Sequence, residues 1–182
     1  SGFIKGEKLQ NYINNKVGNR QLQQLPIKFA AVATDFNTGK AVAFNNGNTG
    51  AAVRASASIP NVFQPTLIGN HKYVDGGLSA PVPVTAARGQ GANFVIAVDI
   101  SARPAKLNDS GFFSYLDQSL NIMSGPALEY QLRQANVVIK PAVQQLGSVG
   151  GFDQKTAAIR LGEQAARAAL PEIKRKLAAY QY

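Results

Sequence analysis

The sequence contains no cysteine and only one histidine, His71. Without cysteine the chain can form no disulfide bond, no thiol nucleophile and no thiolate metal site. A single histidine also excludes a histidine-rich metal centre. Charged residues make up 16% of the chain, below the roughly 25% of ordinary soluble domains, whereas hydrophobic residues make up 45%. This balance, in 182 residues, predicts one compact domain with a sizeable core.

Long apolar runs are also lacking, and none approaches the ~18 uninterrupted residues of a membrane-spanning helix. The net charge is +9, and the densest basic cluster is EIKRKL at residues 172–177. Such an excess is compatible with nucleic acid, with an anionic membrane surface, or with solubility alone. Because zinc-finger spacing and an RNP-type strand are missing, we expect no nucleic-acid partner. The basic cluster is interpreted mainly as a solvated helix face, with contact to an anionic membrane as the alternative.

Nucleotide-binding motifs are missing as well. The Gly-x-Gly of this chain, at residues 89–91, precedes an apolar strand-like run instead of following one. We therefore expect Gly89 or Gly91 to end a helix. The sequence has no Gly-x-x-x-x-Gly-Lys-Ser/Thr phosphate loop. No cofactor is expected.

Apolar periodicity and turn residues predict an α/β chain with helices on both faces of a sheet. Two hairpins are expected, one between the apolar runs 27–34 and 41–44 and one around Gly69-Asn70. The apolar runs 93–101 and 136–141 predict buried strands, the first covered on both faces of a largely parallel sheet. Helices are predicted at residues 5–16 and 51–58, in the stretches before and after Pro126, and in the tail, which begins at Asp153 and restarts at Pro171.

Three ionisable side chains are candidates for chemistry, each with a structural alternative. Asp99 ends the run 93–101, and α/β sheets bind ligands at the carboxyl ends of strands, but an aspartate there equally binds loop amides. Asp35 has the same two interpretations. His71 is the one available base of a Ser-His-Asp arrangement, yet it lies in a predicted turn and ~13 Å from Asp75 along an extended strand. The structural role is favoured for all three.

The stretch KYVDGGLSAPVPV, residues 72–84, contains the stronger candidate, Asp75. The preceding Tyr-Val pair is strand-like, so Asp75 is expected at a strand end. Gly76 and Gly77 permit positive φ angles and leave no side chain between the carboxylate and an incoming group. A general base must lie within ~2.6–3.2 Å of the nucleophile, and it gains basicity from partial desolvation. The same residues fit a common Asp-Gly turn, and on their own they do not decide between the two roles.

Several blocks around Asp75 resemble one family in order and spacing. They are IKGEKLQNYI, LPIKFAAVATDFNTGKAVAF, AAVRASASIPNVFQP, KYVDGGLSAPVPVTAARGQGANFVIAVDIS and ANVVIKP. Together they resemble the later part of bacterial patatin-like phospholipase domains, and the likeness covers most of the chain. It implies that residues 1–182 are the C-terminal portion of a single patatin-like domain, with the N-terminal part missing. The implied fold has three layers, α/β/α, around a mainly parallel central sheet.

The resemblance also implies a lipid acyl hydrolase, of the phospholipase A or esterase type, that uses a Ser–Asp dyad. Asp75 matches the dyad aspartate, and Gly76 and Gly77 complete the family's Asp-Gly-Gly motif. The family's serine lies in a Gly-x-Ser-x-Gly nucleophile elbow, and a glycine-rich loop forms the oxyanion hole. Neither occurs in this sequence, and Ser56 and Ser58 fall in a different block, where we expect them to shape the site. The resemblance therefore implies that this chain supplies the base, lacks the nucleophile and is inactive alone.

The alternative is a non-catalytic binding or regulatory module of the same ancestry that has lost the nucleophile. The expected partners are a phospholipid or other lipid ester, the missing N-terminal half, if need be as a separate chain, and an anionic membrane touched by the tail with Tyr180 and Tyr182. The compartment is left open between cytoplasmic, membrane-associated and exported. One apolar helix side is interpreted as core packing, with an acyl-chain groove as the alternative; its members are Phe112, Phe113, Leu116 and Met123.

Overall fold

The structure, a computed structural model, describes residues 4–101, 112–146 and 154–180. Its helices are α1 (Glu7–Lys16), α2 (Thr49–Ser56), α3 (Val84–Gly89), α4 (Phe112–Arg133) and α5 (Lys155–Tyr180). Its strands are β1 (Ala31–Asp35), β2 (Ala41–Phe44), β3 (Thr66–Ile68), β4 (His71–Asp75), β5 (Ile96–Val98) and β6 (Val137–Ile139). Short 3-10 turns are η1 (Leu22–Gln24), η2 (Gly76–Leu78) and η3 (Val143–Leu146). Within these ranges, no helix has the length and apolar character needed to cross a bilayer.

Strands β1 to β4 form an antiparallel sheet in the order β2-β1-β4-β3. The turn 36–40 joins β1 to β2 and Gly69-Asn70 joins β3 to β4, so both predicted hairpins are confirmed. Strands β1 and β4 also run antiparallel, with Ala33 opposite Asp75. Among the described strands, only β5 and β6 pair in parallel, and α4 connects them. The α/β class is confirmed, but the prediction of a mainly parallel sheet is wrong for the larger sheet. Its two hairpins make β1–β2 and β3–β4 antiparallel, and the central pair β1–β4 is antiparallel as well.

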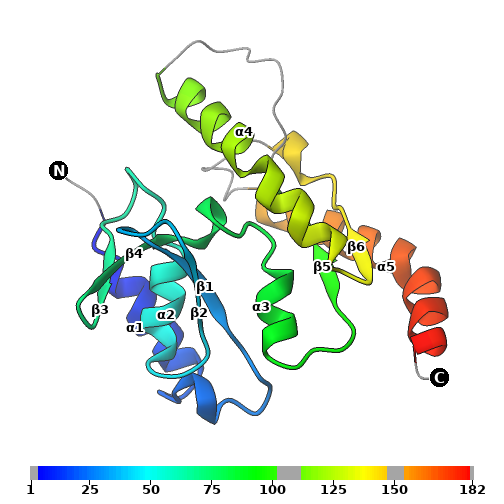
Figure 1. Ribbon diagram of the computed structural model, residues 1–182, viewed down its shortest axis with the longest axis horizontal. Coiled ribbons are helices and arrows are strands. Elements are labelled where there is room, and N and C mark those ends of the chain that lie inside the picture. The colour runs from blue at the N-terminus through cyan, green and yellow to red at the C-terminus, as the bar shows by residue number, and fades with distance from the viewer. Residues whose placement is uncertain (1–3, 102–111, 147–153, 181–182) are drawn as a thin grey trace.

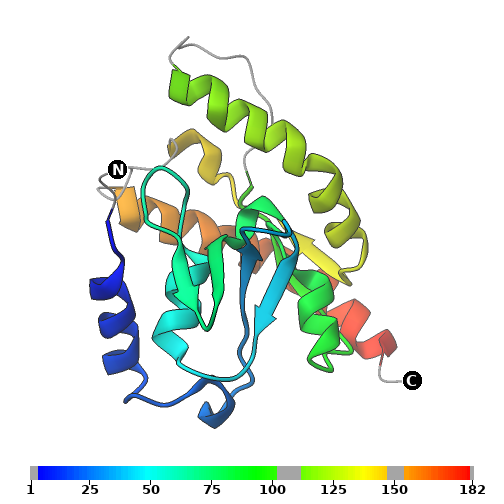
Figure 2. The ribbon, with the colours of Figure 1, turned by 60° about the vertical axis from the view of Figure 1, so that its left-hand side comes forward.

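The four-stranded sheet with α1 and α2 lies on one side of the molecule, and the β5–β6 pair with α4 and α5 lies on the other (Figure 1). Helix α3 lies between the two, as the second view also shows (Figure 2). Strand β1 is buried along its whole length. Ala31 and Ala33 pack against Ala52 and Ala55 of α2, whereas Val32 faces α3. This alternation is expected of successive strand residues, and it places helices on both faces of β1.

A second hydrophobic core lies beneath α4 and α3. It consists of Val82, Val84, Val95, Ala97, Leu128 and Leu132. It also explains why α4 continues as one helix through Pro126, where the sequence predicted a break. A proline inside a helix removes one hydrogen bond and strains the turn. Leu128 and Leu132, directly after it, are only 3% and 7% exposed, and this burial offsets that cost.

Helix α5 likewise runs as one helix through Pro171, where a second segment was predicted to start. No residue of α5 is buried, and two contacts of its later half tie it to the rest of the molecule. The ammonium of Lys176 donates a 2.8 Å hydrogen bond to the carbonyl of Asn136, and the ring of Tyr180 lies edge-on to Phe94 at 5.9 Å. Both partners belong to the β5–β6 side of the molecule.

Strand β5 is less buried than the sequence predicted. Ile96, Val98 and Ile100 expose 42%, 53% and 63% of their surface, while Ala97 between them is buried. In the described part of the chain, β5 pairs with β6 alone and forms the edge of a two-stranded sheet. Parallel strands are usually covered on both faces. The exposed side chains of Ile96 and Val98 show that the prediction of a strand buried on both faces is wrong. One apolar face of β5 is thus largely uncovered, and among the described strands its edge away from β6 is unpaired.

Candidate functional site

Asp75 is the last residue of β4 and caps the turn η2. Its carboxylate oxygen Oδ1 accepts a 2.7 Å hydrogen bond from the backbone N–H of Gly77. Its own N–H donates to the carbonyl of Ser58 at 3.0 Å, and its carbonyl accepts from the hydroxyl of Thr34 at 2.8 Å. The backbone of Asp75 is therefore fixed on both sides, and the predicted position at a strand end is confirmed.

The hydroxyl groups of Thr34 and Ser79 form a short relay behind this backbone. Their oxygens lie 2.7 Å apart. Because Thr34 gives its proton to the carbonyl of Asp75, the hydroxyl of Ser79 must donate to Thr34. Sequence reasoning missed both residues. The available signal was a threonine, 5% exposed in the structure, at the end of the mostly apolar run 27–34.

Of the two glycines after Asp75, Gly76 is required for space, and Gly77 lies against the carboxylate of Asp75. A Cβ atom on Gly76 would lie 2.0 Å from the carbonyl oxygen of Val32, and one on Gly77 would lie 2.9 Å from Oδ1 of Asp75. Neither glycine has a positive φ angle, so the predicted use of left-handed backbone is wrong. The close approach of η2 to β1 explains Gly76 instead. Gly77 keeps the carboxylate free of a neighbouring side chain, as predicted.

The environment of Asp75 raises the pKa of its carboxyl above the ordinary 3.8. Burial is the main cause, because desolvation disfavours the charged form. The N–H of Gly77 stabilises the carboxylate and works in the opposite direction. A carboxylate with a raised pKa is a stronger proton acceptor than a solvated aspartate.

Two cavities meet at Asp75 and Gly77, which line both of them. The smaller has a volume of about 350 Å³ and extends between β1 and α2, with Ser56 in its wall. The larger has a volume of about 610 Å³ and extends from the end of β1 to α4, where Met123 lines it. The carboxylate of Asp75 is thus accessible from two directions.

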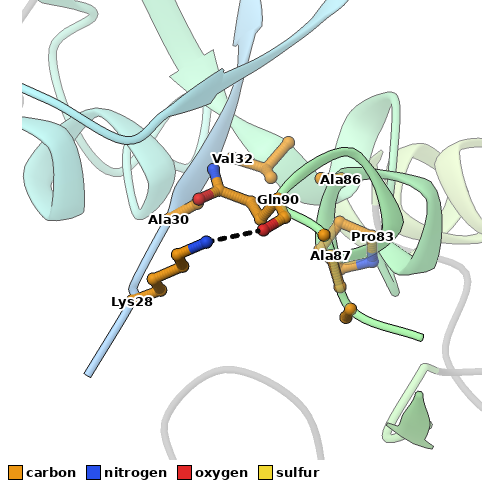
Figure 3. Close-up of a pocket in the computed structure, with 9 residues that line it drawn as sticks. Lys28, Ala30, Val32, Pro83, Ala86, Ala87 and Gln90 are labelled. Atoms are coloured by element: carbon orange, nitrogen blue, oxygen red, sulfur yellow. Dashed lines mark hydrogen bonds between the residues drawn. The ribbon is translucent and has the colours of Figure 1, made fainter. Parts of the chain in front are cut away.

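A third cavity, of about 360 Å³, lies between β1 and α3 (Figure 3). Lys28, Ala30 and Val32 form one wall, and half of the residues in the facing wall are alanine. Its one charged group, the Lys28 ammonium, donates to the carbonyl of Gln90 at 3.3 Å across the opening. Among the described residues that line it, Lys28 is the one ionisable side chain, and the cavity shares Ala30, Val32 and Pro83 with the smaller cavity at Asp75.

Asp35 and His71 form a pair that the sequence did not predict. Nδ1 of His71 lies 3.0 Å from Oδ2 of Asp35, while Oδ1 of Asp35 accepts from the N–H groups of Asn37 and Thr38 and from the Thr38 hydroxyl. The N–H of Thr38 is the main cause of a lowered Asp35 pKa, which burial opposes and His71 reinforces. Asp35 stabilises the turn after β1, in agreement with its structural interpretation. His71 binds Asp35 rather than Asp75.

The other candidates occupy structural positions. Asp99 is 2% exposed and accepts the N–H of Ser101 at 3.0 Å, the loop-amide role that was one of its two interpretations. It lines neither cavity at Asp75. Ser58 is buried against Thr66, with their oxygens 2.9 Å apart, whereas Ser56 lines the smaller cavity. Among the residues named in the sequence analysis, four have side chains that lie outside the described part of the structure: Phe112, Phe113, Leu116 and Tyr182.

No hydroxyl group in the described residues hydrogen-bonds to the carboxylate of Asp75, which bonds only to Gly77. Those residues also contain no cluster of three histidine, aspartate or glutamate side chains that would hold a metal ion. The arrangement provides a positioned, partly desolvated carboxylate beside two cavities. It can accept a proton from a group that enters either one.

Comparison with known proteins identifies similar sequences. A model of the patatin-like phospholipase family matches residues 1–88. An uncharacterized NTE family protein of Mycobacterium bovis is 37% identical over 105 residues, which are 58% of this chain and 29% of that protein. A second one, of Mycobacterium tuberculosis, is 28% identical over 195 residues, which are 93% of this chain and 33% of that protein. Patatin-like phospholipase domain-containing protein 7 of Mus musculus is 29% identical over 105 residues, 57% of this chain and 8% of its own. The chain thus spans a third or less of the length of these relatives.

Proposed function

Because the chain belongs to the patatin-like phospholipase family, we propose that it forms the general-base half of a lipid acyl hydrolase. Asp75 is the base, and Gly76 and Gly77 form the turn that holds it. The observation that carries this proposal is the environment of the Asp75 carboxylate: partly buried, raised in pKa and open to two cavities. Perturbed carboxyl groups in cavities are frequent at catalytic sites.

The proposed reaction is acyl transfer from a lipid ester to a serine and then to water. Asp75 accepts the hydroxyl proton as the serine Oγ attacks the ester carbonyl, and backbone N–H groups stabilise the oxyanion. When the tetrahedral intermediate collapses, the C–O bond to the alcohol breaks and Asp75 returns its proton to the leaving alcohol. Water then attacks the acyl-serine, Asp75 accepts its proton, and the serine recovers it as the fatty acid leaves.

We place the serine and the oxyanion loop outside these residues. The sequence has no Gly-x-Ser-x-Gly segment. Each mycobacterial relative is at least about three times as long as the segment that this chain matches. The open edge of β5 gives independent support. Among the described strands β5 pairs only with β6, so the backbone groups of its other edge offer pairing positions for a further strand of the same sheet. A nucleophile elbow is a strand-to-helix turn, so it requires such a strand.

The missing elbow also favours a second candidate function, a non-catalytic module of the same ancestry that binds lipid or a partner. The two candidates differ in one respect that an experiment can measure. In the enzyme, the proton affinity of Asp75 activates a serine. In the binding module, Asp75 only caps the turn η2.

A fluorophosphonate, which reacts with activated serine hydroxyls, separates them. In a polypeptide that joins these 182 residues to a Gly-x-Ser-x-Gly segment of the same protein, we expect rapid labelling of that serine. Asp75→Asn should slow the labelling by about 10²-fold or more, because the base is removed. Asp35→Asn removes a second carboxylate from the same cavity and should leave the rate unchanged.

The 182-residue chain alone should neither react with the fluorophosphonate nor hydrolyse esters. Labelling that is indifferent to Asp75→Asn contradicts the base assignment. Asp75-dependent hydrolysis by the chain alone contradicts the placement of the nucleophile outside it.

A further inference from the structure

Helix α5 carries an apolar stripe on its solvent side. Ile159, Leu170 and Leu177 expose 63%, 43% and 39% of their surface, and Ala166 is exposed as well. Ala166 follows Ile159 by seven residues, which is almost two turns of an α-helix. Leu170 and Leu177 have the same spacing, and Leu170 lies about three turns beyond Ile159. The four side chains therefore lie along one side of the helix, and we call them the α5 stripe.

A row of basic side chains runs beside the α5 stripe. Arg160, Arg167 and Lys174 are also spaced by seven residues, and all three are exposed. Arg160 and Arg167 directly follow Ile159 and Ala166, which places the basic row about 100° around the helix from them. A cationic row along an apolar stripe is typical of helices that lie in the interface of a membrane.

Helix α5 packs on the rest of the molecule through a different side. Its half-buried residues include Leu161, Ala165 and Ala169, and it contacts β6 and η3. The helix lies at the edge of the molecule beside the β5–β6 pair, and its C-terminal end points away from the four-stranded sheet (Figure 1). The α5 stripe is therefore accessible to another molecule.

The charges beside the stripe determine which molecule fits. The two acidic residues of α5 are already bound within the helix: Glu163 pairs with Arg167 at 2.7 Å, and Glu172 pairs with Lys176 at 2.8 Å. Arg160 and Lys174 form no ion pair with the described residues, in a chain whose net charge is +9. A second copy of this surface would bring like charges together. An anionic bilayer attracts them and accepts the apolar side chains below its headgroups.

We infer that the α5 stripe and its basic row dock the protein on an anionic phospholipid surface. Helix α5 lies parallel to the membrane, with Ile159, Leu170 and Leu177 below the headgroups. Arg160 and Lys174 lie at the level of the phosphates. The inference is independent of the proposed function, because docking requires neither Asp75 nor a serine.

The test is co-sedimentation of the 182-residue chain with vesicles of two compositions, at about 0.1 M sodium chloride. One is pure phosphatidylcholine, and the other contains about 30% phosphatidylserine. We expect a partition coefficient at least about tenfold larger on the anionic vesicles, which falls as the salt concentration rises. Equal binding to the two kinds of vesicle overturns the inference, as does binding to neither.

Two double variants locate the basic surface. Arg160→Gln with Lys174→Gln should lower the partition coefficient on anionic vesicles by about tenfold or more, because both charges lie at the membrane. Lys40→Gln with Lys72→Gln removes the same charge from exposed positions of the two hairpins and should lower it by about twofold or less. Equal losses from the two double variants would indicate attraction by net charge alone and overturn the inference.

A tryptophan probe tests whether the stripe enters the lipid. The chain has no tryptophan, so a single one reports on its own surroundings. Fluorescence of the variant Ile159→Trp should shift to the blue when anionic vesicles are added, because the indole leaves water. Leu67→Trp is the matched control, since Leu67 in β3 is 65% exposed, and it should show no shift.

A shift at both positions, or at neither, overturns the inference. A blue shift of Ile159→Trp that grows with protein concentration in the absence of lipid would assign the stripe to a second copy of the chain. That result also overturns docking on phospholipid.

Discussion

The hydroxyl of Thr34 in β1 donates a 2.8 Å hydrogen bond to the carbonyl oxygen of Asp75 at the end of β4. The two strands pair antiparallel at this point, and Ser79 donates to Thr34 from the far side of η2. The carboxylate of Asp75 is therefore positioned by the sheet as well as by its Asp-Gly-Gly turn. The hydrogen bond from Thr34 thus helps to fix the end of β4, where the pairing with β1 stops at Asp75.

Removal of this hydroxyl should destabilise the fold. Thr34→Val keeps the shape of the side chain but leaves the Asp75 carbonyl and the Ser79 hydroxyl without their partner. We expect a loss of about 1–3 kcal/mol in the free energy of unfolding, measured by urea titration. Thr34→Ser keeps the hydroxyl and loses one methyl group, so its loss should be about 1 kcal/mol or less. Equal stabilities of the valine variant and the unmodified chain would refute the relay.

Gly76 should tolerate no side chain. In Gly76→Ala the new Cβ atom collides with the carbonyl oxygen of Val32, which is backbone and cannot rotate away. We expect a loss of about 1–3 kcal/mol or more in the free energy of unfolding. Gly162→Ala in α5 is the matched control, because no atom lies within 4 Å of the added Cβ. It should stabilise the chain by about 0.5–1 kcal/mol, since alanine is the better helix residue.

Asp75→Asn should make the 182-residue chain more stable at neutral pH. The folded-state pKa of Asp75 is raised above 3.8, so its favourable contribution is complete below 3.8 and is lost as the pH rises through the folded pKa. Asparagine carries no charge to desolvate and keeps an Oδ1 atom for the N–H of Gly77. A higher melting temperature than that of the unmodified chain at pH 7, with the gap closing toward pH 3, is the expected result. A lower melting temperature at pH 7 would show that burial does not penalise the carboxylate.

Asp35→Asn should have the opposite effect. The folded-state pKa of Asp35 is lowered from 3.8, so its stabilising contribution is present above 3.8 and is lost as the pH falls through the folded pKa. The variant should be less stable than the unmodified chain at pH 7, with the deficit shrinking in acid. Melting curves from pH 7 to pH 3 measure both aspartate variants in parallel. If both variants raise, or both lower, the melting temperature at pH 7, the environment of Asp35 or that of Asp75 is described wrongly.

Local sequence signals predicted the elements that depend on neighbouring residues. The hairpin around Gly69-Asn70, the helix at Glu7–Lys16 and the strand end at Asp75 all follow from turn residues and apolar periodicity. The helix breaks predicted at the two prolines are wrong, since Pro126 and Pro171 lie inside continuous helices. Packing on the β5–β6 unit maintains both helices, and no local pattern contains that information.

The relationships that build the site are not local. The hydrogen bond from Thr34 to Asp75 and the pair of Asp35 with His71 join residues that are 41 and 36 positions apart. Both depend on the antiparallel pairing of β1 with β4, which the sequence did not indicate. The role of Gly76 was likewise hidden, because its neighbour in space is the backbone of Val32. A single sequence shows a glycine but not the atom that it approaches.

In the proposed mechanism, Asp75 transfers protons in addition to capping the turn η2. The most direct test is the pre-steady-state release of p-nitrophenolate from a long-chain p-nitrophenyl ester by the polypeptide that carries both halves of the site. Because Asp75→Asn keeps the cap to Gly77 and removes only the base, it separates the two roles. We expect Asp75→Asn to lower both the burst rate and the steady-state rate by about 10²–10⁴-fold, since Asp75 serves acylation and deacylation. A burst and a steady state equal to those of the unmodified protein would contradict the proposed mechanism.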